Sequence, residues 1–353
     1  MPAPVSRFHA LIRGERRGPV AYLMRAGLWW ARLPYAVGVW VRNRGFDRHP
    51  GRAVRVPVPV VCVGNLTLGG TGKTVCVEYV ARFYRELDRA VAILSRGYGS
   101  ADGGPNDEAM VLEENLPDVP HLQGADRVAL ANSAVEELES DLLVLDDGFQ
   151  HRRLFRDLDV VLIDATRPLA GEYLFPRGTL REPVGTLKRA GFVLLTRCDQ
   201  AAESVQQQVD WVEERFPNLP VGKTVHKPVE LVGPDGATAD VAEVAGKSVG
   251  TVCGIGNPES FARTVADLGA TLIASRVYPD HHAYTADDVA ELTAWAETLP
   301  PDAVILTTQK DWVKLRVGDL GGRKVWAVRV GLKFLDGEER FREVLRGVIP
   351  DWG

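Results

Sequence analysis

The chain has 353 residues, of which 45% are apolar and 25% are charged, a composition typical of a globular protein long enough for two domains. The net charge of −5 is uneven: residues 1–58 hold eleven arginines against two acidic residues and carry +9, which leaves −14 for the remainder. The four cysteines include no Cys-x-x-Cys pair and the N-terminus has no uninterrupted apolar core, which disfavours a disulfide scaffold, a zinc site and a secretory signal.

Residues 21–41 mix apolar and aromatic residues with arginines. Arg25 and Arg32 lie seven positions apart, so they share one face of a helix, and Trp29 and Trp40 add aromatic surface. The stretch is too interrupted to span a membrane, which takes ~20 nearly uncharged residues. Aromatic rings beside arginines are typical of a helix in the membrane interface. We therefore expect residues 1–54 to form a basic, amphipathic, membrane-contacting arm; the alternative is a helix packed on the domain core. No nucleic-acid partner is expected, because no nucleic-acid motif accompanies the arm.

Residues 60–74 predict a phosphate-binding loop. Residues 60–63 are typical of a strand buried on both faces, and residues 75–87 have helical spacing. The expected nucleotide-binding residues between and at the start of these elements are Thr67, Leu68, Gly69, Gly70, Thr71, Gly72, Lys73 and Thr74. Glycines let backbone N–H groups converge on an anion, and Lys73 and Thr74 would serve the β/γ-phosphates and Mg²⁺. The strict P-loop pattern has glycine at the position of Thr67. The alternative to a phosphate-binding loop is therefore a glycine-rich turn that arose by chance.

A strand at 90–94 is followed by a loop rich in Gly and Asp that extends through residues 106–108, so Asp107 is expected in a loop, and then by a helix at 126–139. An apolar strand over residues 141–147 comes next. It ends in Asp146 and Asp147. A strand that ends in an aspartate can fix a carboxylate for Mg²⁺ beside the phosphates of a bound nucleotide. Further strands are expected at 160–163 and 192–195, and the loop 168–183 between them is either a site for a phosphorylated acceptor or a solvated loop. Strands alternating with helices predict a P-loop NTPase-type α/β fold, with a parallel sheet, helices on both faces and a kinase domain over residues 55–227.

A second, smaller α/β domain is expected over residues 228–353. Strands are predicted at 248–253, 272–277 and 304–307, and helices at 259–268 and 285–298. The Gly-x-Gly at 254–256 lacks a third glycine at the spacing of a dinucleotide site, which indicates a tight turn. His281 and His282 are adjacent but have no further spaced metal ligands, which favours a general base or a loop role.

Together, these motifs resemble those of the tetraacyldisaccharide 4′-kinase family, the lipid A 4′-kinases of Gram-negative bacteria. The stretches that carry the resemblance occur in the family's order at residues 64–74, 94–99, 146–152, 180–183, 279–281 and 307–311. The most specific is Asp146-Asp147-Gly148-Phe149-Gln150-His151-Arg152. The family also has Ser or Thr at the position of Thr67.

The resemblance implies ATP- and Mg²⁺-dependent phosphorylation of the 4′-hydroxyl of a tetraacylated glucosamine disaccharide 1-phosphate, which gives lipid IVA in lipid A biosynthesis. It implies a P-loop domain, a smaller α/β domain and an N-terminal helix resting on the inner membrane. The expected partners are the lipid A precursor glycolipid and the inner-membrane surface, on its cytoplasmic face. The oligomeric state is left open.

The resemblance also assigns roles to residues. The general base falls on Asp107 and its partner histidine on His281, with Asn106 replacing the family's usual glycine before the base. Lys73 and Asp147 complete the expected catalytic set. The expected metal ligands are Thr74, Glu108, Asp146 and Asp147, and the arginines associated with the phosphorylated lipid fall on Arg127 and Arg181.

The alternative function is a P-loop GTPase or a membrane-associated switch ATPase. The stretch 196–199 follows a strand near where a guanine-binding Thr/Asn-Lys-x-Asp would lie. However, Arg197 replaces the lysine, and residues 146–148 contain no Asp-x-x-Gly switch.

Overall fold

The computed structural model describes residues 8, 10–97 and 107–349, and the chain divides into two compact units. Unit 1 comprises residues 1–96, 122–225 and 333–353, and unit 2 comprises residues 97–121 and 226–332. The sequence analysis expected two consecutive domains, residues 55–227 and 228–353. The two units of the structure are not consecutive, because residues 97–121 belong to unit 2 and residues 333–353 belong to unit 1. Two long strands run through both units. The chain passes from unit 1 to unit 2 within β7 (Val221–Val232) and back to unit 1 within β13 (Arg323–Asp336).

A parallel sheet forms the centre of unit 1, in the order β7-β6-β5-β1-β4-β2-β3. Its other strands are β1 (Val60–Asn65), β2 (Val91–Ser95), β3 (His121–Gln123), β4 (Leu142–Asp146), β5 (Leu158–Asp164) and β6 (Phe192–Thr196). Every residue of β1, β2, β4, β5 and β6 is buried, as parallel strands covered on both faces require. Val63 pairs with Asp146, so the carboxyl ends of β1 and β4 lie side by side.

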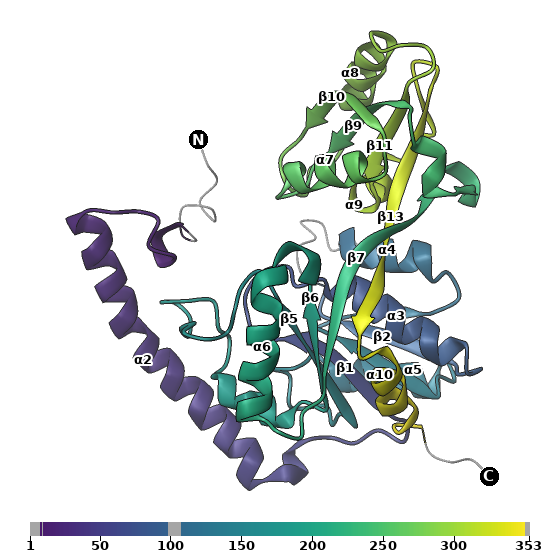
Figure 1. Ribbon diagram of the computed structural model, residues 1–353. Helices are drawn as coiled ribbons and strands as arrows, with labels where there is room; N and C mark the ends of the chain where they lie inside the picture. Colours follow the sequence, from purple (N-terminus) through teal and green to yellow (C-terminus); the bar gives the residue numbers. More distant parts are fainter. Residues whose placement is uncertain (1–7, 9, 98–106, 350–353) are drawn as a thin grey trace. The chain divides into compact units, whose positions relative to one another are not determined.

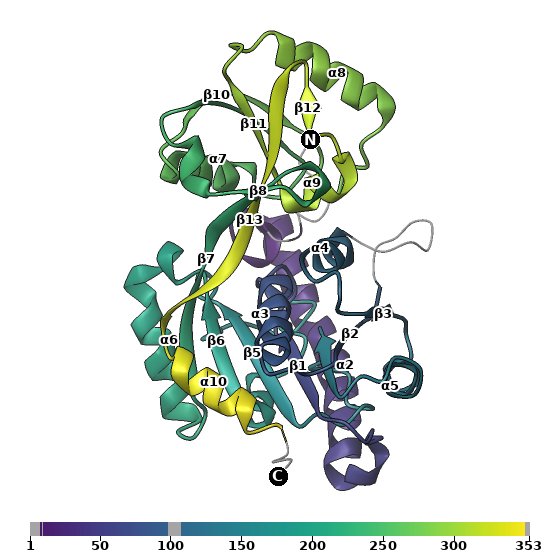
Figure 2. The same cartoon turned by 90° about the vertical axis from the view of Figure 1, so that its right-hand side faces the viewer.

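Helices cover both faces of this sheet, as the sequence predicted. They are α3 (Lys73–Arg85), α5 (Arg127–Glu136), α6 (Ala202–Arg215) and α10 (Glu338–Arg346). Helix α3 connects β1 to β2, toward one edge of the sheet, and α6 connects β6 to β7, toward the other edge. Because such crossovers are right-handed, the two helices lie on opposite faces of the sheet. Figures 1 and 2 show α3 and α10 together on one face. There the hydroxyls of Tyr79 and Tyr84 donate to Glu338 and to the carbonyl of Leu345, at 2.9 and 2.8 Å.

Helix α2 (Pro19–Arg48) lies on the opposite face from α3 (Figure 2). Much of its apolar surface is exposed: Val20, Tyr22, Leu23, Trp30, Val37, Trp40 and Val41 are each more than half accessible. Within the described ranges, no helix combines the length and the apolar character needed to cross a bilayer.

The second half of α2 is attached to the segment that follows the loop 168–180. Tyr35 donates to the carbonyl of Arg181 at 2.8 Å. The carboxylate of Glu182, which is fully buried, pairs with Arg42 of α2 and with Arg189, and Asn43 donates to it at 3.2 Å. These contacts hold the helix on unit 1 while its apolar residues remain exposed.

The strands of unit 2 follow the order β10-β9-β11-β13-β7 and belong to the same hydrogen-bonded sheet, through β7. β8 (Thr238–Ala239) pairs with β7, and β12 (Asp319–Leu320) pairs with β13. The strands predicted at 248–253, 272–277 and 304–307 are present as β9 (Ser248–Cys253), β10 (Thr271–Val277) and β11 (Val304–Thr308). The helices are α4 (Asp107–Asn115), α7 (Pro258–Asp267), α8 (Ala286–Glu297) and α9 (Gln309–Leu315).

The expectation that Asp107 lies in a loop is wrong, because Asp107 is the first residue of α4. This helix packs on α9, where Gln309 donates to Asn115 at 2.8 Å and the indole of Trp312 donates to Glu114 at 2.9 Å. Both helices belong to unit 2, and Asp107 belongs to it with them, although the segments before and after residues 97–121 belong to unit 1.

Candidate active site

The turn between β1 and α3 has the backbone geometry of a phosphate-binding loop. Gly69 and Gly72 have φ of 108° and 83°, in the left-handed region where a side chain would be strained. Gly72 is the residue before α3, so the unsatisfied N–H groups and partial positive charge of that helix begin at the loop. Contacts from distant segments hold the loop backbone: Leu68 donates to the carbonyl of Thr179 at 2.8 Å, and Thr196 Oγ1 donates to the carbonyl of Thr71 at 3.0 Å.

Lys73 lies at the first position of α3, and its ammonium is held close to the loop. The Nζ atom is 3.4 Å from Asn65 Oδ1 and 3.5 Å from Asp147 Oδ1. Asn65 is itself oriented by donating from Nδ2 to the carbonyl of Thr67 at 2.8 Å. The Lys73 side chain is only 13% exposed, so it is less accessible than a surface lysine.

Asp147 is the anionic centre of this group. One nitrogen of Arg181, Nη1, lies 2.9 and 2.8 Å from its two carboxylate oxygens. Burial alone would raise the pKa of Asp147, but Lys73 and Arg181 outweigh it and lower the pKa below its ordinary value. The backbone of Asp147 has φ of 51°, and its N–H donates to the carbonyl of Val63 at 2.9 Å, which places the residue against the end of β1.

Arg127, expected to contact the phosphorylated lipid, begins α5 and is buried, with Nη1 donating to the carbonyl of Ala125 at 3.0 Å. Its pKa is lowered mainly by burial and also by Arg96, while Asp147 and Asp146 act in the opposite direction. Unit 1 therefore brings Lys73, both aspartates and both predicted arginines, Arg127 and Arg181, to one edge of its sheet.

The residues at this edge fit a Mg²⁺ ion that is shared with phosphates. Mg²⁺ in such sites takes one or two protein carboxylates, with substrate phosphate oxygens and water completing an octahedron. Thr74 follows Lys73 at the start of α3, Asp146 is the last residue of the neighbouring strand β4, and Asp147 follows it. In the part of the chain that the structure describes, no three His, Cys, Asp or Glu side chains form a metal-holding cluster.

Asp107 and His281 are in contact within unit 2. His281 Nδ1 lies 3.0 Å from Asp107 Oδ2, and Lys314 Nζ donates to the same oxygen at 2.9 Å. Burial would raise the pKa of Asp107, but the hydrogen bonds and charges of Lys314 and His281 outweigh it, so that the pKa is lowered. Glu108, the remaining predicted metal ligand, pairs with Lys310 at 3.0 Å.

The backbone at His281 is fixed by the fully buried Asp311. Its Oδ1 accepts from the N–H of Gly254 at 2.9 Å and from the hydroxyl of Tyr284 at 3.0 Å. The carbonyl of Gly254 in turn accepts from the N–H of His281 at 3.2 Å, where φ is 61°. The adjacent His282 contacts Asp288 at 3.0 Å, so the two histidines have different partners.

The predicted site residues thus form two groups, one in each unit. Lys73, Thr74, Asp146, Asp147, Arg127 and Arg181 belong to unit 1, and Asp107, Glu108 and His281 belong to unit 2. Lys314 was missed by the sequence analysis. Its signal was available: it follows Lys310 by four residues, so the two share a face of any helix that begins at the Thr308-x-x-Asp311 capping pattern.

Removing the guanidinium of Arg181 tests the electrostatic arrangement. Because the folded pKa of Asp147 lies below its ordinary value of 3.8, its ion pairs stabilise the protein above that value, and this stability is lost as the pH falls through the folded pKa. We expect Arg181→Met to lower the free energy of unfolding by about 1–3 kcal/mol at pH 7. The difference from the parent should shrink as the pH falls below about 4, through the ordinary pKa of Asp147 and then its lowered folded pKa.

Urea unfolding from pH 2 to 7 measures this difference across the window in which Asp147 takes up its proton. Arg215→Met is the control, because its ion pair with Glu214 is exposed and should contribute little at any pH. A deficit for Arg181→Met that stays constant across the pH range would contradict the role of Asp147.

Comparisons with known proteins agree over nearly the whole chain. A family model described as tetraacyldisaccharide-1-P 4′-kinase matches residues 24–350. A tetraacyldisaccharide 4′-kinase of Syntrophus aciditrophicus (strain SB) is 37% identical over 324 residues, 85% of each chain. A protein of the same name from Anaeromyxobacter dehalogenans (strain 2CP-C) is 38% identical over 357 residues, 95% of this chain and 93% of the relative.

A solved structure agrees with the fold. LpxK from Aquifex aeolicus in complex with ATP matches with a TM-score of 0.75 and 28% identity, covering 92% of this chain and 99% of that one. These findings favour the kinase over the GTPase or switch ATPase. The chain belongs to the tetraacyldisaccharide-1-P 4′-kinase family.

Proposed function

We propose that this chain transfers the γ-phosphoryl group of ATP to the 4′-hydroxyl of a tetraacylated glucosamine disaccharide 1-phosphate, giving lipid IVA. The observation that carries the proposal is the group formed by Lys73, Asp147 and Arg181 at the start of α3, in a chain of this family. Phosphoryl transfer depends mainly on positioning and on compensation of negative charge, and this group supplies both.

The residues of unit 1 have distinct roles in this proposal. The N–H groups of residues 67–74 bind phosphate oxygens, and Lys73 donates to the β- and γ-phosphates. Arg181 and Arg127 are assigned to the phosphate of the lipid acceptor. Thr74, Asp146 and Asp147 would hold Mg²⁺, which neutralises charge on the phosphates when bound.

In unit 2 we assign proton acceptance to Asp107. His281 and Lys314 both contact Oδ2, so Oδ1 is the oxygen that we assign to the proton of the sugar hydroxyl. The lowered pKa keeps this carboxylate ionised at neutral pH, and the two neighbours fix its orientation. Glu108 is assigned to the metal, with Lys310 as its partner when no metal is bound.

We further propose that α2 docks on the cytoplasmic face of the inner membrane. Its exposed apolar residues have the composition of an interfacial helix, and the +9 charge of residues 1–58 complements anionic lipids. The guanidinium of Arg32 lies over the rings of Trp29 and Tyr173, at 4.6 and 5.3 Å from their centroids. The helix and the loop that contains Tyr173 therefore share one basic, aromatic surface.

Substitution of Lys73 tests the kinase proposal directly. Lys73→Ala should lower phosphorylation of the acceptor in detergent micelles by at least about 10²-fold, because a positioned charge is lost where negative charge develops. The assay compares ATP with GTP, with and without acceptor, and measures the melting temperature of each variant. Lys188→Ala, which removes an exposed lysine, is the control. Wild-type transfer by a folded Lys73→Ala protein would refute the proposal.

The second prediction concerns Asp107 and His281. Asp107→Ala and His281→Ala should each lower kcat about 10²–10⁴-fold with little change in the KM for ATP, because a general base contributes by that order. The double variant should lose far less than the product, since residues that act as a unit are non-additive.

His282→Ala is the matched control, because its partner is Asp288. It should leave kcat within about threefold of the parent, the scale expected when no base is lost. Small, multiplicative effects of Asp107→Ala and His281→Ala would show that the pair is structural.

The third prediction concerns α2. The variant Trp30→Ser/Trp40→Ser should bind phosphatidylglycerol-containing vesicles at least about tenfold more weakly, because aromatic area is no longer buried in the interface. Binding of the parent should also weaken as salt rises. Leu335→Ser, an exposed apolar residue of β13, is the control. Equal vesicle binding by the double variant and the parent would contradict docking through α2.

A further inference from the structure

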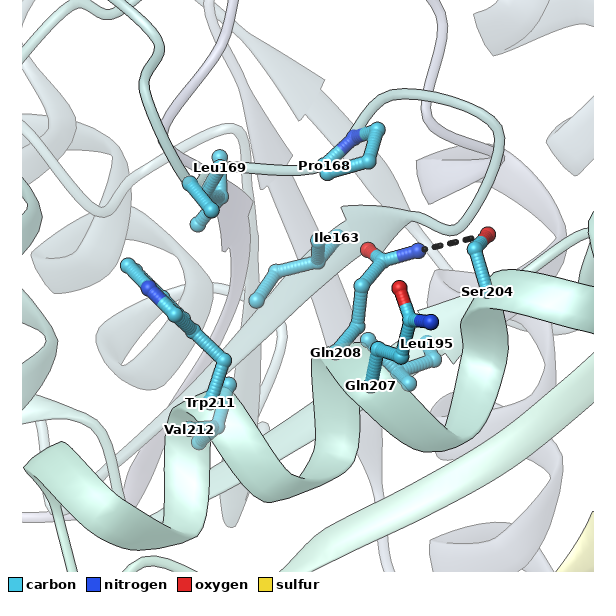
Figure 3. A pocket seen from close by; sticks show the side chains of 10 residues that line it. Ile163, Pro168, Leu169, Leu195, Ser204, Gln207, Gln208, Trp211 and Val212 are labelled. Atoms are coloured by element: carbon cyan, nitrogen blue, oxygen red, sulfur yellow. Dashed lines mark hydrogen bonds between the residues drawn. The ribbon is translucent and has the colours of Figure 1, made fainter.

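A cavity of about 250 Å³ lies in unit 1 between α6 and the ends of β5 and β6 (Figure 3). Apolar side chains form most of its wall: Ile163, Leu195, Pro168, Leu169, Trp211 and Val212. None of these residues has a role in the site described above. At about 30 Å³ for a group the size of a water molecule or a methylene, the cavity has room for about eight such groups.

Gln208 contributes a polar atom that is unusual in such a wall. Its side chain is buried, at 7% exposed, and Nε2 donates to the carbonyl of Ala165 at 2.7 Å and reaches Ser204 Oγ at 3.5 Å. These contacts fix the nitrogen end of the amide. The other end, Oε1, is buried and has no hydrogen-bond partner among the described residues. In Figure 3 it points toward Leu169 and Ile163. A buried acceptor without a donor is costly, so it indicates a missing ligand group.

We infer that this cavity receives one acyl chain of the acceptor, and that an amide N–H or a hydroxyl near the head of the chain donates to Gln208 Oε1. The inference rests on the proposed function, which supplies an acceptor with four acyl chains. The chemistry matches: the walls suit methylenes, and the single unsatisfied acceptor suits the single donor near the head of an amide-linked or hydroxylated chain.

The cavity is linked to the phosphate loop by consecutive hydrogen bonds. Gln208 donates to the carbonyl of Ala165, whose N–H donates to the carbonyl of Thr196 at 2.9 Å, and Thr196 Oγ1 donates to Thr71 of the loop. Close by, Arg167 Nη1 lies 3.3 Å from where a Cβ on Gly69 would be, and Arg167 directly precedes Pro168 in the wall. A chain held in the cavity would therefore keep its head group near the phosphate loop within the same unit.

Blocking the cavity at its rim tests the inference without disturbing the core. Ala170 is exposed and lines the cavity, so Ala170→Trp should fold and cover the opening. The probes are the tetraacylated glucosamine disaccharide 1-phosphate and an analogue with short acyl chains. We expect the ratio of kcat/KM for the long-chain over the short-chain acceptor to fall at least about tenfold, because each methylene kept in water costs about a factor of four. Ala202→Trp, an exposed alanine of α6 outside the cavity, is the control and should keep the parent's ratio.

A second measurement does not depend on catalysis. An acceptor with a diazirine in one acyl chain, irradiated with the parent protein without ATP, should label residues between 163 and 212. Gln208→Leu should weaken binding of the same probe about two- to tenfold, the range for one lost hydrogen bond. Three results would overturn the inference. The ratio of kcat/KM for the long-chain over the short-chain acceptor could be unchanged in Ala170→Trp, the substitution could raise the KM for ATP without changing this ratio, or the label could be confined to segments outside residues 163–212. If the parent phosphorylates the acceptor, each of these results overturns the acyl-chain site alone; if it phosphorylates no acceptor, the proposed function itself fails.

Discussion

Two consecutive residues, Arg181 and Glu182, hold the parts of unit 1 on which its chemistry depends. The N–H of Arg181 donates to the carbonyl of Leu66 at the start of the phosphate loop, its side chain binds Asp147, and its carbonyl accepts from Tyr35 of α2. Glu182 is fully buried between arginines, and breaking such a pair typically costs about 3–5 kcal/mol. The phosphate loop, the acidic strand end and the exposed apolar helix are therefore attached to the same short segment. A lipid surface bound by α2 would lie at a defined position relative to the phosphate loop.

The backbone at this edge is arranged for the site at some cost in stability. Asp147 has φ of 51°, a conformation that costs about 1–3 kcal/mol for a residue other than glycine. The surroundings compensate: its N–H is bound by Val63, and Gln150 donates to the carbonyl of Asn65 at 2.8 Å. Both contacts join the segment after β4 to the end of β1. The parallel register of these two strands thus determines how Lys73 and Asp147 meet.

The sequence predicted what is contiguous and missed what depends on the fold. The strand, loop and helix around Lys73 could be predicted because each lies in one short stretch with its own pattern. The division into units could not, because it falls within β7 and β13, where no change of composition marks it. Asp107 was placed in a loop because the packing of α4 on α9 is not local. The helical spacing of Lys314 from Lys310 is a local signal, but its contact with Asp107 depends on the same packing. Only the fold brings Asp147 to the ammonium of Lys73, whose side chain is 13% exposed.

Charge pairing explains why Asp147 and Asp107, the two carboxylates with proposed catalytic roles, have lowered pKa values. Asp147 is neutralised by Lys73 and Arg181, and Asp107 by Lys314 and His281, so each stays ionised at neutral pH in its own unit. Leaving a buried charge unpaired is costly, so a site that binds phosphate and Mg²⁺ needs partners for its charges in both the empty and the bound state. In the proposed reaction Lys73 and Arg181 would turn from Asp147 to phosphate oxygens, and Asp147 would be one of the residues that hold Mg²⁺. Every charge then exchanges one partner of opposite sign for another, so binding requires neither a proton to be taken up by Asp147 nor a bare carboxylate to be buried.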